Sequence, residues 1–299
     1  KKRTPLHLAA IGIVSFRNST PVLETLLKAG VHKEPRDELY RTPLHLAAEN
    51  GCESTVGILL KTGVEKDPGD EFYRTPLHLA AKNGCDSTVE ILLKSGVEKD
   101  PGDDFYRTPL HLAAKNGCDS TVEILLKSGV EKDPGDDLYR TPLHYAVNNG
   151  RDSIVELLLK AGVEKDPRDE THKTPLHLAA ENGHDSTVQI LLRADVKKEP
   201  RDKKKRTPFH LAATGKYSFM NYTPVLETLL KAGVSKEPRD ELYRTPLHLA
   251  AENGCESTVG ILLKTGVEKD PRDETHKTPL HLAAEYGRDS TVQILLKAD

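Results

Sequence analysis

The sequence predicts an all-α repeat solenoid, built from helix-turn-helix units that are joined by extended, hairpin-like finger loops. The main observation is a seven-residue motif, Thr-Pro-Leu-His-Leu-Ala-Ala, which is first complete at residues 42–48. Exact or near copies of the motif begin at Thr4, Thr42, Thr75, Thr108, Thr141, Thr174, Thr207, Thr245 and Thr278. Six of the eight intervals between these copies are 33 residues long and two are 38. A fixed period of this size indicates stacked units rather than one globular core.

Each unit is expected to begin with a short helix, for which the unit at Thr75 is an example. A threonine hydroxyl is a typical N-cap, and Pro76 follows at the first helical position, where its missing N–H costs nothing. Ala80 and Ala81 lie on one side of this helix and let the next helix approach closely. Gly84 is expected to end the helix in the left-handed conformation.

A second helix and a finger loop complete each unit. The second helix is expected to start within residues 86–88, where Ser87 and Glu90 have the spacing of a capping box, and to stop at Gly96. Residues 97–107 contain Pro-Gly and several acids, and this composition disfavours a helix. The segment is therefore predicted to be the extended finger loop that leads to the next unit.

The period and the repeated motif resemble the ankyrin repeat family over essentially the whole chain. The resemblance implies a single array of nine repeats over residues 1–299. It also implies that the histidine three residues after each N-cap threonine bonds the threonine hydroxyl and ties adjacent loops together. This structural role is expected for Thr42, His45, Thr75, His78, Thr108, His111, Thr141, His144, Thr174, His177, Thr245, His248, Thr278 and His281.

A longer period divides the array into two blocks. Residues 1–83 and 204–286 are close copies, so the chain is interpreted as a six-repeat block (1–203) and a three-repeat block (204–299). The two 38-residue repeats carry insertions at about 11–18 and 214–222. Aromatic residues of these insertions are expected either to pack over the neighbouring repeat or to contact a partner: Phe16, Tyr217, Phe219 and Tyr222.

The finger loops depart from the ankyrin pattern in two ways. Tyr73 and its counterparts occupy a position where the family usually has glycine, which predicts either a different turn or a strained φ. Lys66 and its counterparts stand where an apolar residue is common. We expect their alkyl stems to pack while the ammonium group reaches water.

Composition and motifs exclude several classes of function. The net charge of −3 gives no reason to expect nucleic-acid binding, and no apolar run is long enough to insert in a membrane. The sequence contains no phosphate-binding glycine loop, nucleophile elbow or metal cluster, so we expect a non-enzymatic protein without cofactor or metal. The four cysteines recur one to a repeat and are expected to be small, half-buried thiols of an intracellular, cytoplasmic protein.

The resemblance implies a protein–protein interaction scaffold that binds through its finger loops and concave face, and that is an excerpt of a longer repeat protein. Its partners are expected to be other proteins or further copies of itself. An alternative is a structural element that stacks end to end into filaments or higher oligomers. The finger residues expected to contact a partner, because tyrosine and arginine dominate binding hot spots, are Tyr40, Arg41, Phe72, Tyr73, Arg74, Phe105, Tyr106, Arg107, Tyr139, Arg140, Tyr243 and Arg244.

Overall fold

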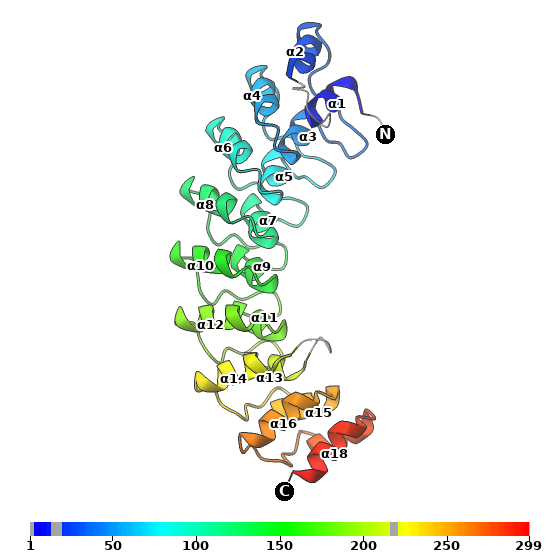
Figure 1. Ribbon diagram of the computed structural model, residues 1–299, viewed down its shortest axis with the longest axis vertical. Coiled ribbons are helices and arrows are strands. Elements are labelled where there is room, and N and C mark those ends of the chain that lie inside the picture. Colours follow the sequence, from blue (N-terminus) through cyan, green and yellow to red (C-terminus); the bar gives the residue numbers. More distant parts are fainter. Residues whose placement is uncertain (1–2, 13–19, 216–220, 299) are drawn as a thin grey trace. The chain divides into compact units, whose positions relative to one another are not determined.

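A computed structural model of the chain describes residues 3–12, 20–215 and 221–298 (Figure 1). It divides into two compact units, residues 1–163 (unit 1) and 164–299 (unit 2), and each is described by itself. The boundary between the units does not coincide with the boundary between sequence blocks at 203 and 204. Repeats are numbered 1 to 9 in the order of their N-cap threonines, so that repeats 1 to 5 begin in unit 1 and repeats 6 to 9 in unit 2.

All regular elements among the described residues are helices, and each repeat contributes two. In unit 1 they are α1 (Pro5–Ile11), α2 (Thr20–Lys28), α3 (Pro43–Glu49), α4 (Glu53–Lys61), α5 (Pro76–Lys82), α6 (Asp86–Lys94), α7 (Pro109–Asn116), α8 (Asp119–Lys127), α9 (Pro142–Asn148) and α10 (Asp152–Lys160). In unit 2 they are α11 (Pro175–Glu181), α12 (Asp185–Arg193), α13 (Pro208–Ala213), α14 (Thr223–Lys231), α15 (Pro246–Asn253), α16 (Glu256–Lys264), α17 (Pro279–Glu285) and α18 (Asp289–Lys297).

Within each unit the helices form two layers (Figure 1). The odd-numbered first helices pack against one another in one row, and the even-numbered second helices form the other row. Each first helix also packs on the second helix of its own repeat. Ala80 and Ala81 of α5 and Val89 and Leu92 of α6 are fully buried, so the core runs between the layers from repeat to repeat.

The first helices are capped by a histidine rather than by an acid. The Thr75 side chain accepts from the backbone N–H of His78, and the Thr75 backbone N–H donates to His78 Nδ1 over 3.0 Å. The histidine thus takes the place of the Glu or Gln that usually completes a capping box. Because Nδ1 accepts this bond, the ring proton lies on Nε2.

The proton on Nε2 of the capping histidine forms a hydrogen bond between one repeat and the next. His78 Nε2 lies 2.8 Å from the backbone oxygen of Arg107 in the following repeat, and His45 Nε2 lies 2.9 Å from that of Arg74. The His177 ring makes the same bond to the Arg206 carbonyl in unit 2, also over 2.9 Å. Burial lowers the pKa of His45 and of His177 to about 4, so both rings are neutral near pH 7.

The second helix of the example repeat starts within the predicted residues 86–88, but without the predicted cap. Helix α6 begins at Asp86, and its N-cap residue is Cys85, which makes no side-chain cap bond. The predicted capping box of Ser87 and Glu90 is therefore wrong, and Glu90 instead pairs with Lys94 over 2.7 Å. The predicted ends of both helices are confirmed, since Gly84 and Gly96 have φ of 67° and 80°.

The finger lysines are exposed, as predicted for Lys66 and its counterparts, and they also bond a backbone carbonyl of the next repeat. Lys132 Nζ donates to the Ala161 carbonyl over 2.6 Å, and Ala161 is the C-cap residue of the next repeat's second helix. Lys165 makes the same bond to the Ala194 carbonyl over 2.8 Å. A cation at this end of a helix satisfies an orphan carbonyl and the helix dipole. The lysines therefore clamp consecutive repeats together.

Asp195 is an L-residue at a position where seven other repeats have glycine, and its φ is 62°. A left-handed backbone costs an L-residue about 1–2 kcal/mol in the folded state, and glycine would remove this cost. Glycine also has more conformational freedom in the unfolded chain, which offsets part of the stability gained. Asp195→Gly is therefore expected to stabilise unit 2 by about 0.5–1 kcal/mol in urea denaturation. The reverse change at the matched position in repeat 7, Gly233→Asp, is expected to lower stability. A loss of stability in Asp195→Gly would contradict the strain argument.

Candidate functional site

The finger loops of unit 1 present the same exposed side chains in several successive repeats, and one buried aspartate organises each of these loops. Asp70 Oδ1 accepts from the backbone N–H groups of Phe72 and Arg74 over 2.9 and 3.0 Å. Asp70 Oδ2 accepts from Arg74 Nε and Nη2 over 2.9 and 2.7 Å. These bonds hold the loop closed around the Asp70 carboxylate. Solvent does not reach this carboxylate, since the Asp70 side chain is 0% exposed.

The tyrosine at the tip of each loop of unit 1 has a left-handed backbone. The φ of Tyr73 is 54°, and those of Tyr40, Tyr106 and Tyr139 lie between 56° and 57°. The sequence left open a different turn or a strained φ, and the structure has the strained φ. A tyrosine that is kept in this conformation carries a cost of about 1–2 kcal/mol, and outliers of this kind often mark function.

These tyrosines point away from the protein in unit 1. Tyr40, Tyr73, Tyr106 and Tyr139 are each 60–70% exposed. Each follows a second exposed apolar residue, which is Leu39, Phe72, Phe105 or Leu138. Four neighbouring repeats thus expose one apolar pair apiece, and we call these eight residues the finger row.

Backbone bonds between adjacent loops make the finger row continuous. Glu71 N–H donates to the Leu39 carbonyl over 2.9 Å, and Asp104 N–H donates to the Phe72 carbonyl over 3.0 Å. The Asp137 N–H makes the same bond to Phe105. Each apolar pair is therefore placed directly beside the next one, at the distance of about 10 Å that separates packed helices.

The finger arginines are less available than the sequence suggested. Arg74 is paired with Asp70, its side chain is 19% exposed, and its guanidinium lies 5.0 Å from the centre of the Phe72 ring. The same pairing with the loop aspartate is made by Arg41, Arg107, Arg140 and Arg244. Each of these five arginines therefore holds its own loop, and its contact with a partner stays a prediction.

Of the predicted insertion residues, Tyr222 lies within the described part of the chain, and it does not add to the row. Tyr222 is 4% exposed, and its hydroxyl donates to the Glu181 carbonyl of the preceding repeat over 3.2 Å. It packs over its neighbour, which is the first of the two alternatives that the sequence left open. Phe16, Tyr217 and Phe219 lie outside the described residues.

Unit 2 carries one such apolar pair. Leu242 and Tyr243 are 43% and 62% exposed. At the same place the other three repeats of the unit have the dipeptides 171–172, 204–205 and 275–276, which are Thr-His, Lys-Lys and Thr-His. The run of neighbouring apolar pairs is therefore a property of unit 1.

Repeat 5 differs from the other repeats of unit 1 by a buried tyrosine. Tyr145 stands where the other repeats have leucine, and its hydroxyl donates to Asp136 Oδ2 over 2.7 Å. Arg140 also pairs with Asp136 and lies 5.0 Å from the centre of the Tyr145 ring. Burial alone would raise the pKa of Asp136, but the hydrogen bonds from Arg140 and Tyr145 outweigh it and hold the pKa below its ordinary value.

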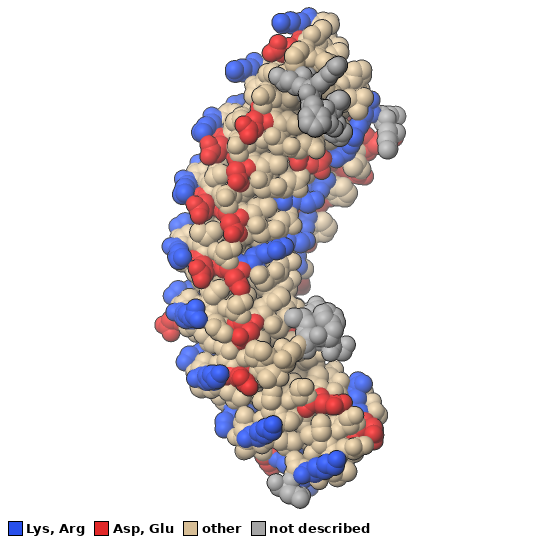
Figure 2. Space-filling view, in the orientation of Figure 1, with Lys and Arg blue, Asp and Glu red and all other residues tan. Residues whose placement is uncertain are grey.

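The opposite layer of unit 1 is a charged, solvated surface. Figure 2 shows acidic and basic side chains alternating along the side where the second helices lie. They include exposed pairs four residues apart, such as Glu90 with Lys94 and Glu123 with Lys127. Exposed pairs of this kind contribute little to stability or specificity, so the finger row is the better candidate site.

Neither metal nor membrane chemistry is indicated in the part of the chain that the structure describes. No group of three or more His, Cys, Asp or Glu side chains in residues 3–12, 20–215 and 221–298 is placed to hold a metal ion. None of the helices described there has the length and apolar character of a membrane span. Cys52, Cys85, Cys118 and Cys255 are half-buried and unpaired, and burial raises the pKa of each thiol.

Comparison with known proteins identifies the repeat. The family described as "Ankyrin repeats (3 copies)" matches the chain over residues 6–103, 78–169, 162–240 and 217–299, which together span nearly all of it. The chain belongs to the ankyrin repeat family. Its nine repeats, helical pairs and capping histidines are those of an ankyrin array, and the predicted fold class is confirmed.

Similarity to individual ankyrin proteins is local. The chain is 47% identical over 57 residues to NF-kappa-B inhibitor alpha from Sus scrofa, Rattus norvegicus and Homo sapiens. The alignment covers 19% of this chain and 16–17% of each relative. The chain thus matches less than a fifth of the length of these relatives.

Proposed function

We propose that this ankyrin array is a non-enzymatic, protein-binding scaffold whose contact surface is the finger row of unit 1. The observation that carries the proposal is the row itself, in which each of four neighbouring repeats exposes an aromatic or apolar pair. Ankyrin repeats generally mediate protein–protein interaction. A relative that is named as an inhibitor of NF-kappa-B is consistent with binding another protein.

The charges at the loop tips suggest the chemistry of the partner. An exposed acid precedes each apolar pair, as Glu71 precedes Phe72 and Asp104 precedes Phe105. The nearby arginines are already paired with buried aspartates, so the outer charge of the row is negative. A partner that combines basic with apolar residues would complement this surface.

The regular spacing favours an extended partner segment. Adjacent pairs are about 10 Å apart, and an extended chain advances about 3.3 Å per residue. One apolar side chain in about every three residues would therefore meet successive loops. We propose a partner segment of about ten to twelve residues with apolar residues at this spacing and basic residues between them.

The test is peptide selection followed by substitution of the four tyrosines. Random peptides displayed on phage are selected on the full chain, and their affinities are compared with those for Tyr40→Asn/Tyr73→Asn/Tyr106→Asn/Tyr139→Asn. Asparagine is chosen because it tolerates left-handed φ, so the loops are expected to keep their shape. A central tyrosine contributes about 2 kcal/mol, so at least a tenfold loss of affinity is expected.

The matched control is Tyr243→Asn in unit 2, which changes the same loop position outside the row. Peptides that bind the finger row are expected to keep their affinity for this control. Equal affinity for the wild-type chain and the fourfold variant would overturn the proposal. A measurement of circular dichroism establishes that the fourfold variant is folded.

The cysteines bear on where the protein works. Four half-buried thiols without a disulfide partner suit a reducing compartment. We therefore propose an intracellular location.

A further inference from the structure

In the first finger loop, an arginine connects its own loop to the next loop along the chain. Arg36 Nη1 donates to the Tyr40 carbonyl over 3.1 Å and to the Gly69 carbonyl of the next loop over 2.8 Å. Arg36 Nη2 lies 3.7 Å from a carboxylate oxygen of Glu65. Two carbonyls and one carboxylate therefore surround this guanidinium.

The same bridge occurs twice in unit 2. Arg201 Nη1 donates to the carbonyls of Lys205 and Arg239 over 2.8 and 2.7 Å. Arg239 Nη1 donates to the carbonyls of Tyr243 and Arg272, also over 2.8 and 2.7 Å. The residue at the loop tip is a lysine in one case and a tyrosine in the other. The bridge therefore depends on the arginine and on the loop backbone rather than on the side chain at the tip.

Three loops of the finger row have glycine in place of this arginine, and these residues are Gly69, Gly102 and Gly135. For Gly69 and Gly102 the next loop also belongs to unit 1, so two complete sets of the surrounding groups lie in this unit. The first set consists of the carbonyls of Tyr73 and Gly102 and the carboxylate of Glu98. The second set consists of the carbonyls of Tyr106 and Gly135 and the carboxylate of Glu131. We call these two sets the arginine slots.

The groups of the arginine slots have no partner among residues 3–12, 20–215 and 221–298. Their four carbonyls accept no hydrogen bond from these residues, and their two carboxylates form no ion pair with them. Gly102 and Gly135 are exposed, whereas Gly69, whose carbonyl Arg36 bonds, is half-buried. The slots are therefore accessible from solvent.

A tyrosine ring flanks each arginine slot. A side chain on Gly69 would begin 3.8 Å from Tyr73 Cδ1, and one on Gly102 would begin at the same distance from Tyr106 Cδ1. The two tyrosines are 68% and 70% exposed. A guanidinium is attracted to an aromatic ring, and its planar fork of donors can bond two acceptors at once. The slots therefore favour arginine over lysine.

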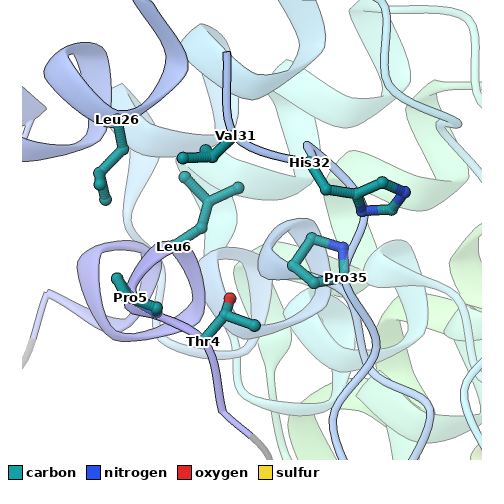
Figure 3. Close-up of a pocket in the computed structure, with 7 residues that line it drawn as sticks. All are labelled: Thr4, Pro5, Leu6, Leu26, Val31, His32 and Pro35. Carbon is teal, nitrogen blue, oxygen red and sulfur yellow. The ribbon is translucent and has the colours of Figure 1, made fainter. Parts of the chain in front are cut away.

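The cavity beside α1 and α2 does not share this chemistry. It has a volume of about 150 Å³, and no carboxylate lines it. Figure 3 shows Leu6 and Leu26 pointing toward Val31 across it. Its lining is mostly apolar, so it does not indicate a charged ligand.

We propose that the two arginine slots bind two arginine side chains of a partner protein, in the geometry that Arg36 has within this chain. The slots are one repeat apart, at a distance of about 10 Å, and an extended chain covers this distance in about three residues. The partner segment is therefore expected to have two arginines with two residues between them. The inference rests on the proposed function, because the slots adjoin the finger row, and it identifies arginine as the basic residue of the partner.

The test compares the binding of two labelled peptides to the full chain by fluorescence anisotropy. One peptide is four Arg-Gly-Gly units, and the other is four Lys-Gly-Gly units. The two have the same charge and spacing, and neither has an apolar side chain for the finger row to bind. The arginine peptide is expected to bind about tenfold more tightly, because a guanidinium can bond both carbonyls and stack on the tyrosine.

The variant Gly69→Arg/Gly102→Arg fills both slots with arginines of the chain itself. It is expected to fold, because Arg36 already occupies the corresponding place beside Tyr40, and circular dichroism checks this. Its affinity for the arginine peptide is expected to be about tenfold lower than that of the wild-type chain.

The matched control is Ser87→Arg/Ser120→Arg, which adds the same two charges at exposed positions of α6 and α8. Salt screens exposed charges, so at about 0.15 M salt this control is expected to change the affinity by less than about twofold. A tenfold loss in the slot-filled variant beside an unchanged control supports the proposal, because added charge alone would affect both.

Three results would overturn the proposal. Equal affinity for the two peptides would show that charge alone attracts them. Equal affinity of the wild-type chain and the slot-filled variant would show that the arginines bind elsewhere. Absence of binding to the wild-type chain would show that the slots do not hold arginine. None of these results would contradict the finger row, because the peptides lack apolar side chains and the four tyrosines are unchanged in the variant.

Discussion

Replacing Asp136 with alanine is expected to lower the free energy of unfolding by about 3–4 kcal/mol, more than any other single change considered for this chain. The Asp136 side chain is 0% exposed and accepts from two backbone N–H groups, from Arg140 and from the Tyr145 hydroxyl. Its loss leaves a half-buried guanidinium and a buried hydroxyl without their acceptor. Urea denaturation followed by circular dichroism measures the change.

Two controls separate the carboxylate from its surroundings. Asp137→Ala removes the neighbouring exposed acid and is expected to change stability by less than about 0.5 kcal/mol. Tyr145→Phe removes one hydrogen bond and is expected to cost about 1 kcal/mol. If Asp136→Ala costs no more than Asp137→Ala, the loop is not organised by its carboxylate.

Acid is expected to unfold the array well above the pH at which its carboxylates are protonated. Burial lowers the pKa of His45, His111, His177 and His210 to about 4. An unfolded histidine titrates near pH 6.5, so the unfolded state takes up protons first as the pH falls. Stability is therefore complete above about pH 6.5 and decreases down to about pH 4, by about 1.4 kcal/mol per pH unit for each histidine.

The measurement is a series of urea denaturations between pH 7.5 and pH 4.5, which covers most of the interval from about pH 6.5 to about pH 4 that the histidine pKa shifts define. Burial raises the pKa of Asp67 and Asp100, which acts in the opposite direction, because their protonation favours the folded state. The matched variant His111→Gln is less stable at neutral pH, but its stability is expected to depend on pH less steeply, by the contribution of one histidine. Identical slopes for the wild-type chain and His111→Gln would contradict the role of this ring.

The features that the sequence predicted correctly depend on local chemistry. Pro76 marks the start of α5, and Gly84 and Gly96 mark helix ends, because each preference belongs to the residue itself. The fold class follows from the period, since units that repeat every 33 residues bury their faces against one another. The exposed tyrosines were recognised from residue type at a loop tip.

The features that the sequence did not reveal depend on another repeat. Lys132 bonds the end of a helix 29 residues further along the chain, and the hydroxyl of the buried Tyr222 bonds a carbonyl of the preceding repeat. The residues next to Lys132 and Tyr222 in the sequence do not indicate either contact. The pairing of Arg74 is indicated locally, because an aspartate stands four residues before the arginine in every Tyr-Arg finger loop. That spacing was sufficient to predict a loop-closing ion pair instead of a free hot-spot residue.

The lysine and histidine bonds between repeats have a consequence for how fast the chain folds. Each of them connects residues that are 29 to 34 positions apart, whichever repeat is considered. The mean sequence separation of these contacts therefore stays constant as repeats are added, and the relative contact order falls with chain length. Folding rates depend inversely on contact order, so a pair of neighbouring repeats is the natural nucleus, from which structure spreads one repeat at a time. Lengthening such an array adds stability without adding a slow search for distant partners.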